Sequence, residues 1–467
     1  MQNKTQTREA LNHEVGKIQG PNGQELFVHL DQPQLSSDGG LLLIASDPWT
    51  ERVMGELTRC LEEKRRTPRH SLQEMIAQRV LQIVAGYEDV NDATMLRHDG
   101  LLQASVGLKP GANSALASQP TLCRLENRVT KRDLIRLFYA QIDLFMDSYA
   151  GEKVPPMLVL DLDPTACLTY GQQELGFYNA HVGDHCLMPF HLYEGISARL
   201  IATVLRPGKT PNASEMISLL KRVQRRIRQR WPRVTLMLRA DSHHTKPEVL
   251  DWLESQGISY TMGYAPNAVL ERECREQTTQ ARKIYGQRLD AGEQEPEVRR
   301  FHSVTYRSRS WSKSRRVVAR IAITPLGVDL RYIVTSFEDA KAKGLYEKVY
   351  CGRGAAELYI KEHKLDLGGD RLSCNSAKAN QFRLFLHGAA YTILHGFRRT
   401  ILAGTRLAKA SFAQLRLKLV KIASRLDADT KSLHLHLPWQ HPSSDMIGTL
   451  MTRIAQHREK SAWLWMT

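Results

Sequence analysis

Two short apolar runs that end in acidic residues constrain the fold of this chain more than any other feature. MLVLDLD (157–163) and VTLMLRAD (234–241) have the composition of buried strands, and a basic helical pattern (216–231) lies between them. Strands that alternate with helices are typical of an α/β sheet. Because an open α/β sheet binds ligands beyond the carboxyl ends of its strands, the acids at these ends predict a polar site there.

The first 150 residues are predicted to be mainly helical. Residues 71–85 and 130–150 place apolar side chains at helical spacing, and Ser71 can cap the first of these helices. Residues 86–99 are predicted to form a turn and a short helix that Asn91 caps. Several arginines are expected to give this region a basic side: Arg65, Arg66, Arg69, Arg79 and Arg97.

The second half of the chain shows a different pattern. Strands are predicted at 198–206 and 258–265, with a helix at 247–257. From 266 to 338 the helical alternation is predicted to stop, because RRFHSVTYRS, RRVVARIAIT and DLRYIVTSF indicate a β-rich insertion.

The C-terminal region predicts both helix and sheet. Residues 381–402 form an apolar helical pattern, and the alternating runs 415–422 and 432–437 predict a β-hairpin with a longer loop.

The charge of the chain favours a polyanionic partner. The net charge is +16, from 65 Lys and Arg against 49 Asp and Glu, and residues 371–425 contain eleven basic residues and no acid. Within that segment Lys418 and Lys421 are predicted to contact DNA phosphates. No apolar run is long enough to span a bilayer and no lipidation signal is present, so nucleic acid is favoured over a membrane surface.

Other site types find little support in the sequence. Seven scattered cysteines without a C-x-x-C pair indicate reduced thiols in a cytoplasmic protein, and His181 and His185 are read as surface histidines. PGKT (207–210) resembles the end of a nucleotide-binding loop, but the first glycine of that motif is replaced by Thr203. We therefore expect no nucleotide cofactor.

Three acids are candidates for a metal site. Asp163 and Asp241 come at strand ends, and Glu357 lies on a helix that can pack on the sheet. Carboxylates gathered in one cleft repel one another unless cations neutralise them, and Mg²⁺ or Mn²⁺ prefers such oxygen ligands. The structural alternative is that Asp161 and Asp163 only begin a loop and that Asp241 caps the next helix.

The segment YCGRGAAELYIKEHK (350–364) surrounds one of these acids with donors. Tyr350, Arg353, Glu357 and Lys364 fall within about 60° of one another on a helix of 3.6 residues per turn. A solvated helix face would explain this stripe, and so would a metal-binding carboxylate among groups that bind phosphate oxygens.

These residues resemble the DDE-type insertion-sequence transposases. The resemblance rests on D-x-D-x-T (161–165), R-A-D-S (239–242) and Y-x-x-R-x-x-x-E-x-x-x-x-x-x-K (350–364). Five further segments resemble one subgroup: QRVLQIVAGYEDVNDATMLRHD (78–99), TLCRLENR (121–128), YGQQELGFYNAH (170–181), LRPGKTPNASE (205–215) and LRLKLVKIASR (415–425). The resemblance assigns Asp163, Asp241 and Glu357 as the catalytic, metal-binding acids, with Asp161 as the alternative first acid. It assigns Tyr350, Arg353 and Lys364 to phosphate contact.

The resemblance implies an α/β fold with an RNase H-like catalytic core. The expected regions are a helical part that binds DNA ends (1–150), the core in two parts (151–265 and 339–380), the β-rich insertion (266–338) and a basic C-terminal region for DNA contact or oligomerisation (381–467). Its implied function is cut-and-paste transposition, with two Mg²⁺ or Mn²⁺ ions, terminal inverted repeats and target DNA as substrates, a homodimer in the synaptic complex, and a nucleoid-associated location. The alternatives are a metal-dependent DNA nuclease without strand transfer and a catalytically inactive DNA-binding regulator.

Trp311 stands apart from these motifs, in the arginine-rich turn RSRSWSKSRR of the insertion. One interpretation is that its ring stacks on a base displaced from the duplex, as an end that forms a hairpin would require. The other is that it packs against Val317 or Tyr306 to close a β-turn.

Overall fold

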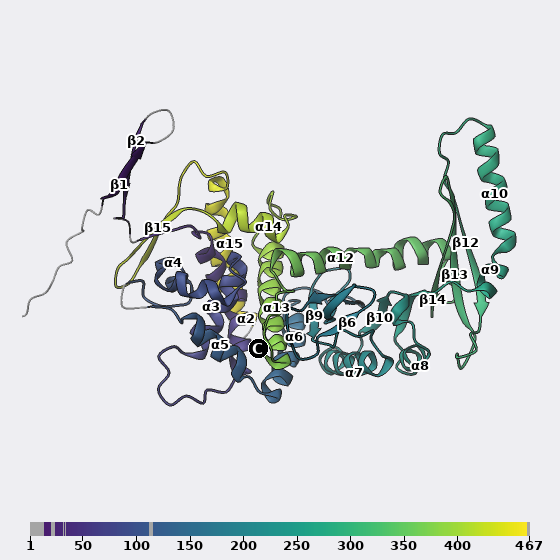
Figure 1. The fold of residues 1–467 in the computed structure, drawn as a ribbon, viewed down its shortest axis with the longest axis horizontal. Coiled ribbons are helices and arrows are strands. Elements are labelled where there is room, and N and C mark those ends of the chain that lie inside the picture. Colours follow the sequence, from purple (N-terminus) through teal and green to yellow (C-terminus); the bar gives the residue numbers. More distant parts are fainter. Residues whose placement is uncertain (1–13, 20–23, 31, 33, 112–114, 465–467) are drawn as a thin grey trace, which may run out of the picture.

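A mixed sheet forms the centre of the molecule. The computed structural model describes residues 14–19, 24–30, 32, 34–111 and 115–464 (Figure 1). Eight strands follow the spatial order β12-β13-β14-β11-β10-β4-β8-β9. Their bounds are β4 (Met157–Pro164), β8 (Phe190–Glu194), β9 (Leu200–Val204), β10 (Thr235–Ala240), β11 (Ser259–Tyr264), β12 (Val298–Tyr306), β13 (Arg315–Thr324) and β14 (Gly327–Thr335).

The central strands form the α/β core that the sequence predicts. β4, β10 and β11 run parallel, β8 pairs antiparallel with β4, and β9 pairs antiparallel with β8. Helices α7 (Ala213–Arg230) and α8 (Pro247–Ser255) lie along one face, while the run that contains α12 (Gly354–Lys361) crosses the other side (Figure 1). Parallel strands joined by helical crossovers must be buried on both faces. The expected RNase H-like α/β fold is therefore confirmed.

The insertion after β11 is partly helical, which the sequence analysis did not predict. It begins with α9 (Ala268–Glu273) and α10 (Arg275–Asp290), and only then forms β12, β13 and β14. On α10 Ala281 is the one fully buried side chain, so the helix carries little of the apolar spacing from which a helix is recognised. β14 pairs with β11, so the three strands extend the core sheet.

Trp311 is part of this insertion and is buried. Its side chain is 4% exposed, and its ring centroid lies 5.1 Å from that of Tyr264 and 5.4 Å from that of Tyr306. The Arg315 guanidinium covers it at 5.2 Å. Since these neighbours occupy the ring, the packing interpretation holds in this structure and the base-stacking interpretation does not.

A second, helical body is built from helices of the first 150 residues and helices that follow residue 376. It contains α2 (Pro48–Arg59), α3 (Leu72–Ala85), α5 (Gln119–Arg128), α6 (Lys131–Asp147), α13 (Ala377–Thr400) and α15 (Ser444–Leu464). Helix α13 packs against α2, α3, α5 and α6, so the first 150 residues share one core with residues far along the chain. Ser71 caps α3 in a capping box, as predicted. The helical turn Val90–His98 is capped by Asp89, not Asn91, because the Asp89 carboxylate accepts the Asn91 N–H.

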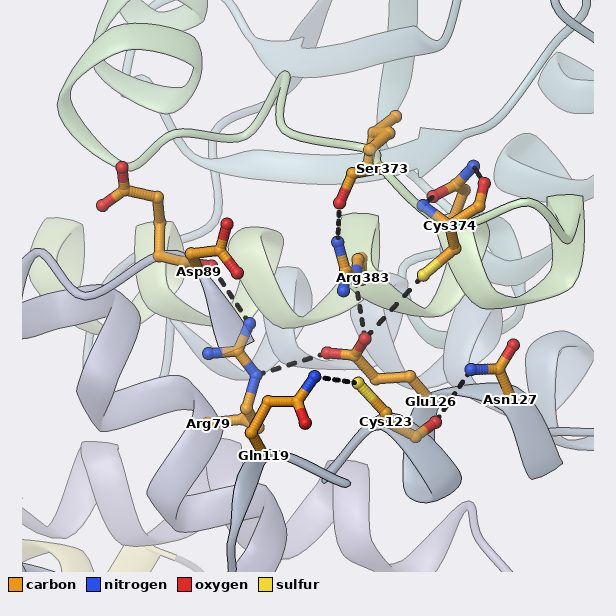
Figure 2. Close-up of polar contacts among 12 residues, drawn as sticks. Arg79, Asp89, Gln119, Cys123, Glu126, Asn127, Ser373, Cys374 and Arg383 are labelled. Atoms are coloured by element: carbon orange, nitrogen blue, oxygen red, sulfur yellow. Dashed lines mark hydrogen bonds and ion pairs between the residues drawn. The ribbon is translucent and has the colours of Figure 1, made fainter. Parts of the chain in front are cut away.

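A buried ion network holds this helical body together (Figure 2). Glu126 on α5 accepts Nε of Arg79 on α3 at 3.3 Å and Nε of Arg383 on α13 at 2.6 Å. Arg79 is almost fully buried, so it does not belong to the basic surface predicted for this region. One carboxylate between two guanidinium groups replaces the water that all three lose on burial, and it joins two of the family-like segments, 78–99 and 121–128, to α13.

The predicted C-terminal hairpin is displaced along the chain. Residues 415–422 are not a strand: α14 (Phe412–Leu415) continues as a helical turn over Arg416–Val420, and the hairpin pairs β15 (Ser424–Ala428) with β16 (Leu433–His436). The buried residues of the segment 415–422 do not alternate, because Leu417 is exposed. They are Leu415, Leu419, Val420 and Ile422. The alternation of leucine and lysine therefore arose without a strand.

The remaining elements are short. They are β1 (Glu14–Gln19), β2 (Glu25–His29), β3 (Leu35–Ser36), α1 (Leu41–Ala45), α4 (Gly100–Ser105), β5 (Cys167–Leu168), β6 (Phe177–Asn179) and β7 (Asp184–Leu187). Across the described ranges, no helix combines the length and the apolar character needed to cross a membrane.

Candidate active site

The carboxyl ends of two neighbouring parallel strands bring Asp163 and Asp241 together. The register of β4 and β10 pairs Asp161 with Arg239. Two residues farther along each strand, the same register leads to Asp163 and Asp241, on the same face because side chains alternate along a strand. Both side chains are partly accessible, with 18% and 26% of their surface exposed.

Asp161 does not share this open position. Its buried carboxylate forms a two-point ion pair with Arg239, with Nε–Oδ1 and Nη2–Oδ2 both 2.6 Å. The remaining Nη1 of Arg239 donates to the carbonyl of Val349 at 2.9 Å. A carboxylate with both oxygens engaged by a buried guanidinium is a structural anchor, and here it fixes the segment just before Tyr350.

The segment that follows carries the predicted donors to the strand ends. The chain is helical from Ala342 to Asp366, with wide turns at Leu345–Tyr350 and Glu362–Asp366 on either side of α12. Arg353 donates Nη1 to Oδ2 of Asp163 at 3.0 Å, and its Nη2 lies 3.9 Å from Oε1 of Glu357. Arg353 therefore stands between two of the three predicted acids.

Tyr350 and Lys364 lie on opposite sides of this point. A Cβ added at Gly263 would meet the Tyr350 hydroxyl at 2.7 Å and the Ser242 nitrogen at 2.8 Å, so the phenol reaches the chain next to Asp241. Lys364 donates Nζ to the carbonyl of Ala166 at 2.8 Å. The stripe predicted on the helix is thus divided: Tyr350 and Arg353 face the acids, and Lys364 holds the loop after β4.

Burial and mutual repulsion set the charges of the acids. Burial, together with the charges of Asp241 and Glu357, raises the pKa of Asp163 to about 6 against the lowering effect of Arg353. For Asp241, burial also acts to raise the pKa, but the hydrogen bond and positive charge of His244 prevail and hold that pKa well below its usual range. Of these two acids, Asp163 is therefore the one whose charged form is less stabilised by its surroundings.

His244 is a site residue that the sequence analysis missed. Its imidazole is fully buried, and Nδ1 lies 2.5 Å from Oδ1 of Asp241. The same carboxylate oxygen accepts the backbone N–H of His243, so Asp241 does cap the short turn after β10, as the structural alternative supposed. An imidazole in this position fixes the orientation of the carboxylate. The signal was present in the sequence as two histidines directly after R-A-D-S.

The two C-terminal lysines differ in their surroundings. Lys418 is exposed. Lys421 forms an ion pair with the buried Asp38 at 2.6 Å, and its ammonium lies 3.9 Å from the centre of the Tyr87 ring. Lys421 therefore neutralises Asp38 inside the protein, and of the two only Lys418 remains placed for a phosphate.

The donor set at the strand ends has the chemistry of a divalent-metal site. Asp163, Asp241 and Glu357 offer hard oxygen ligands, and burial with the charges of the other two acids raises the pKa of Asp163 even though Arg353 donates to it. Among the described residues, no three Asp, Glu, His or Cys side chains already stand close enough to hold an ion. Glu357, 69% exposed at its side chain, must turn toward the strand ends to complete the set.

Comparisons with known proteins gave matches to solved structures and to one family model. The structure of a piggyBac transposase synaptic complex with hairpin DNA is similar at 10% identity and a TM-score of 0.42, over 82% of this chain and 80% of that chain. A Mos1 transposase paired-end complex with the left transposon end is similar at 15% identity and a TM-score of 0.18, over 43% of this chain and 61% of that chain. No curated protein matches the sequence. The family model described as transposase DDE domain group 1 matches residues 21–459, and the chain therefore belongs to this transposase family.

Proposed function

We propose that this chain cleaves DNA at the ends of an insertion sequence and joins the freed ends to target DNA, in a cut-and-paste reaction that depends on divalent metal. The observation that carries the proposal is the pair Asp163 and Asp241 at adjacent strand ends, with Arg353 donating to Asp163 at 3.0 Å. Family membership supplies the reaction class.

Asp163, Asp241 and Glu357 are the residues that would hold two Mg²⁺ or Mn²⁺ ions. Such ions lower the pKa of an attacking water and neutralise charge on the phosphate. Hydrolysis forms a bond from the water oxygen to phosphorus and breaks the bond to the 3′ oxygen, which leaves as a hydroxyl. In strand transfer that hydroxyl oxygen attacks a target phosphorus and displaces the target's own 3′ oxygen.

The other side chains of the site would bind the substrate. Arg353 neutralises Asp163 while the site is empty of DNA, and a phosphate oxygen would take over that guanidinium, which has further N–H groups to offer. The Tyr350 hydroxyl, beside the Asp241 turn, would donate to a neighbouring phosphate. Lys364 would keep the loop after β4 in place and add positive charge.

Recognition of the ends is assigned to the helical body within residues 1–150, where Arg66 and Arg69 are exposed. The acid-free segment 371–425, through Lys418, would add contacts to phosphates that do not depend on sequence. Two copies of the chain would hold the two ends in a synaptic complex.

The proposal is tested with a plasmid that carries the flanking inverted repeats, incubated with the full chain and Mg²⁺ or Mn²⁺. Asp163→Asn, Asp241→Asn and Glu357→Gln are expected to abolish cleavage while the protein still binds the ends. The matched control is Glu347→Gln on the same helical run, a carboxylate that faces Lys343 at 3.9 Å.

Three results would redirect the proposal. Full cleavage by Glu357→Gln would remove Glu357 from the site. Cleavage without joining, when DNA with pre-cut ends is supplied, would indicate a nuclease without strand transfer. Absence of nicking by the unmodified chain with either metal would leave the DNA-binding regulator.

A further inference from the structure

Two of the family-like segments, YGQQELGFYNAH (170–181) and LRPGKTPNASE (205–215), have no part in the chemistry proposed above. They meet in the structure. The backbone N–H of Gly208 donates to Leu175 at 3.1 Å, and the Asn179 side chain donates to the carbonyl of Gly208 at 2.8 Å. We call residues 165–189, with the loop 207–209 behind them, the aromatic shelf.

The shelf is a small sheet that continues directly from Asp163. Its strands have the order β5-β7-β6, with β7 in the middle. A Cβ at Gly208 would collide with the carbonyl of Cys186, so this close packing explains the glycine of PGKT. Lys209 of the same loop lies over the Phe177 ring at 4.1 Å.

One side of the shelf is firmly attached to the protein. Gln173 donates to the carbonyls of Leu372 and Cys374 at 2.9 and 3.1 Å. The Glu174 N–H donates to the carbonyl of Asn375 at 2.9 Å, and its carboxylate accepts the N–H of Ala377 at 2.7 Å. The shelf is therefore held in place before any ligand arrives.

The other side presents tyrosines to solvent. Tyr178 is 61% exposed and Tyr170 is 81% exposed. Both flank β7 at one point, because Tyr178 pairs with His185 in the sheet and the residue before Tyr170, Thr169, donates its N–H to the carbonyl of His185 at 2.9 Å. Two phenol rings left this open on a fixed sheet contribute little to the core.

The shelf also lies beside the acids. The ring of His181 is 6.0 Å from that of His243, and Nδ1 of His243 is 3.5 Å from Oδ2 of Asp241. Lys364 ties the other end of the shelf to the helical run through the carbonyl of Ala166. A ligand held on the shelf would therefore be next to the phosphate that the acids cleave.

Polar groups on or beside the shelf can contact a nucleotide. Lys209 is an exposed cation and the rings of His181 and His185 are exposed. The two nearby acids, Asp184 and Glu174, each already accept a backbone N–H. Aromatic rings with nearby cations hold unpaired nucleotides by stacking and phosphate contact.

We infer that the aromatic shelf binds an unpaired nucleotide of the DNA beside the scissile phosphate, with Tyr178 stacking on its base. This inference rests on the proposed function for the identity of the substrate. It assigns to the shelf the base-stacking role that the sequence suggested for Trp311, which is buried elsewhere.

The test measures binding in EDTA, so that it needs no cleavage. The probe is a short duplex with one unpaired 2-aminopurine, compared with the same duplex in which that base is paired. With the unmodified chain we expect the fluorescence of the unpaired base to be quenched. Tyr178→Leu is expected to lose the quenching and to bind the unpaired probe roughly fivefold to a hundredfold more weakly, with the paired probe nearly unaffected.

Two further variants sharpen the result. Tyr178→Phe keeps the ring and is expected to keep quenching and affinity. Leu326→Ala removes another exposed apolar side chain, at a β-turn of the insertion, and is expected to behave as the unmodified chain.

Several outcomes would overturn the inference. They are Tyr178→Leu binding both probes like the unmodified chain, an equal loss for both probes with a lower melting temperature, and a change of oligomeric state without a change in DNA binding, which would make the shelf a protein contact. Failure of the proposed function is a separate result, because it appears as absent Mg²⁺-dependent cleavage by the unmodified chain.

Discussion

Arg239 and Asp161 form a buried two-point ion pair across the adjacent strands β10 and β4, and Arg239 passes the constraint on to the carbonyl of Val349. This pair separates the two acids of D-x-D-x-T. Asp161 anchors the sheet to the helical run, and Asp163 is left at the open strand end for chemistry.

Replacement of Asp161 is expected to lower mainly the stability, and replacement of Asp163 to lower mainly the cleavage activity. Asp161→Asn should destabilise the protein by about 3–5 kcal/mol, because it leaves the buried Arg239 without its counter-ion. Asp163→Asn should abolish cleavage but keep the stability close to that of the unmodified chain, because burial already raises the pKa of Asp163 to about 6. Denaturant unfolding in EDTA measures the stability of both variants, and plasmid nicking with Mg²⁺ measures their cleavage. Equal stability of the two variants would contradict the anchor role of Asp161.

Two glycines of the helical run 342–366 provide a matched pair of variants that tests the contact with Arg239. A Cβ at Gly352 would lie 2.5 Å from Nη1 of Arg239, whereas a Cβ at Gly354 meets nothing within 4 Å. Gly352→Ala is expected to cost about 1–3 kcal/mol and to lower cleavage, because the segment must move away from Arg239.

Gly354→Ala is expected to raise the stability by about 0.5–1 kcal/mol, because alanine favours a helix. Thermal unfolding and plasmid nicking are the measurements. A Gly352→Ala protein as active and stable as Gly354→Ala would show that the contact with Arg239 is dispensable.

Lys418 and Lys421 are expected to respond differently to truncation. Lys418→Ala should reduce the salt dependence of DNA binding by about one unit of slope, as the loss of one phosphate contact does. Lys421→Ala should leave the slope unchanged and lower the stability by about 1–3 kcal/mol, because the buried Asp38 loses its counter-ion and keeps only the hydrogen bond from Tyr87. DNA affinities measured at several salt concentrations test this difference. A flatter slope for Lys421→Ala would show that Lys421 also contacts a DNA phosphate.

His387 is expected to make the protein acid-sensitive. Burial, with the charges of Arg79 and Arg383, lowers the pKa of His387 to about 3, and its Nδ1 lies 2.9 Å from the carbonyl of Leu367. Below about pH 6.5 His387 is protonated in the unfolded chain but stays neutral in the folded chain. The free energy of unfolding therefore falls by about 1.4 kcal/mol per pH unit until about pH 3.

His387→Asn should therefore flatten the fall in unfolding free energy between pH 6.5 and pH 4. His98→Asn, at an exposed position, is the control and should leave the slope unchanged. Parallel curves for the unmodified chain and His387→Asn would exclude this histidine as a source of acid sensitivity.

The sequence by itself determined the elements whose side chains face one environment throughout. β4 and β10 are continuous apolar runs because parallel strands are covered on both faces. The start of α3 could be predicted because Ser71 caps it. The motifs that contain Asp163, Asp241 and Glu357 also supplied the candidate site residues, of which the structure brings Asp163 and Asp241 to adjacent strand ends and leaves Glu357 exposed.

The tertiary structure alone decided what each side chain pairs with. Asp161 and Asp163 are equivalent as sequence, and only the position of Arg239 on the next strand separates them. In the same way Lys421 forms its ion pair with Asp38, and the rings of Tyr264 and Tyr306 pack against Trp311. These partners lie far apart along the chain, and the burial of a charge or a ring depends on the folded surroundings and not on its neighbours in sequence.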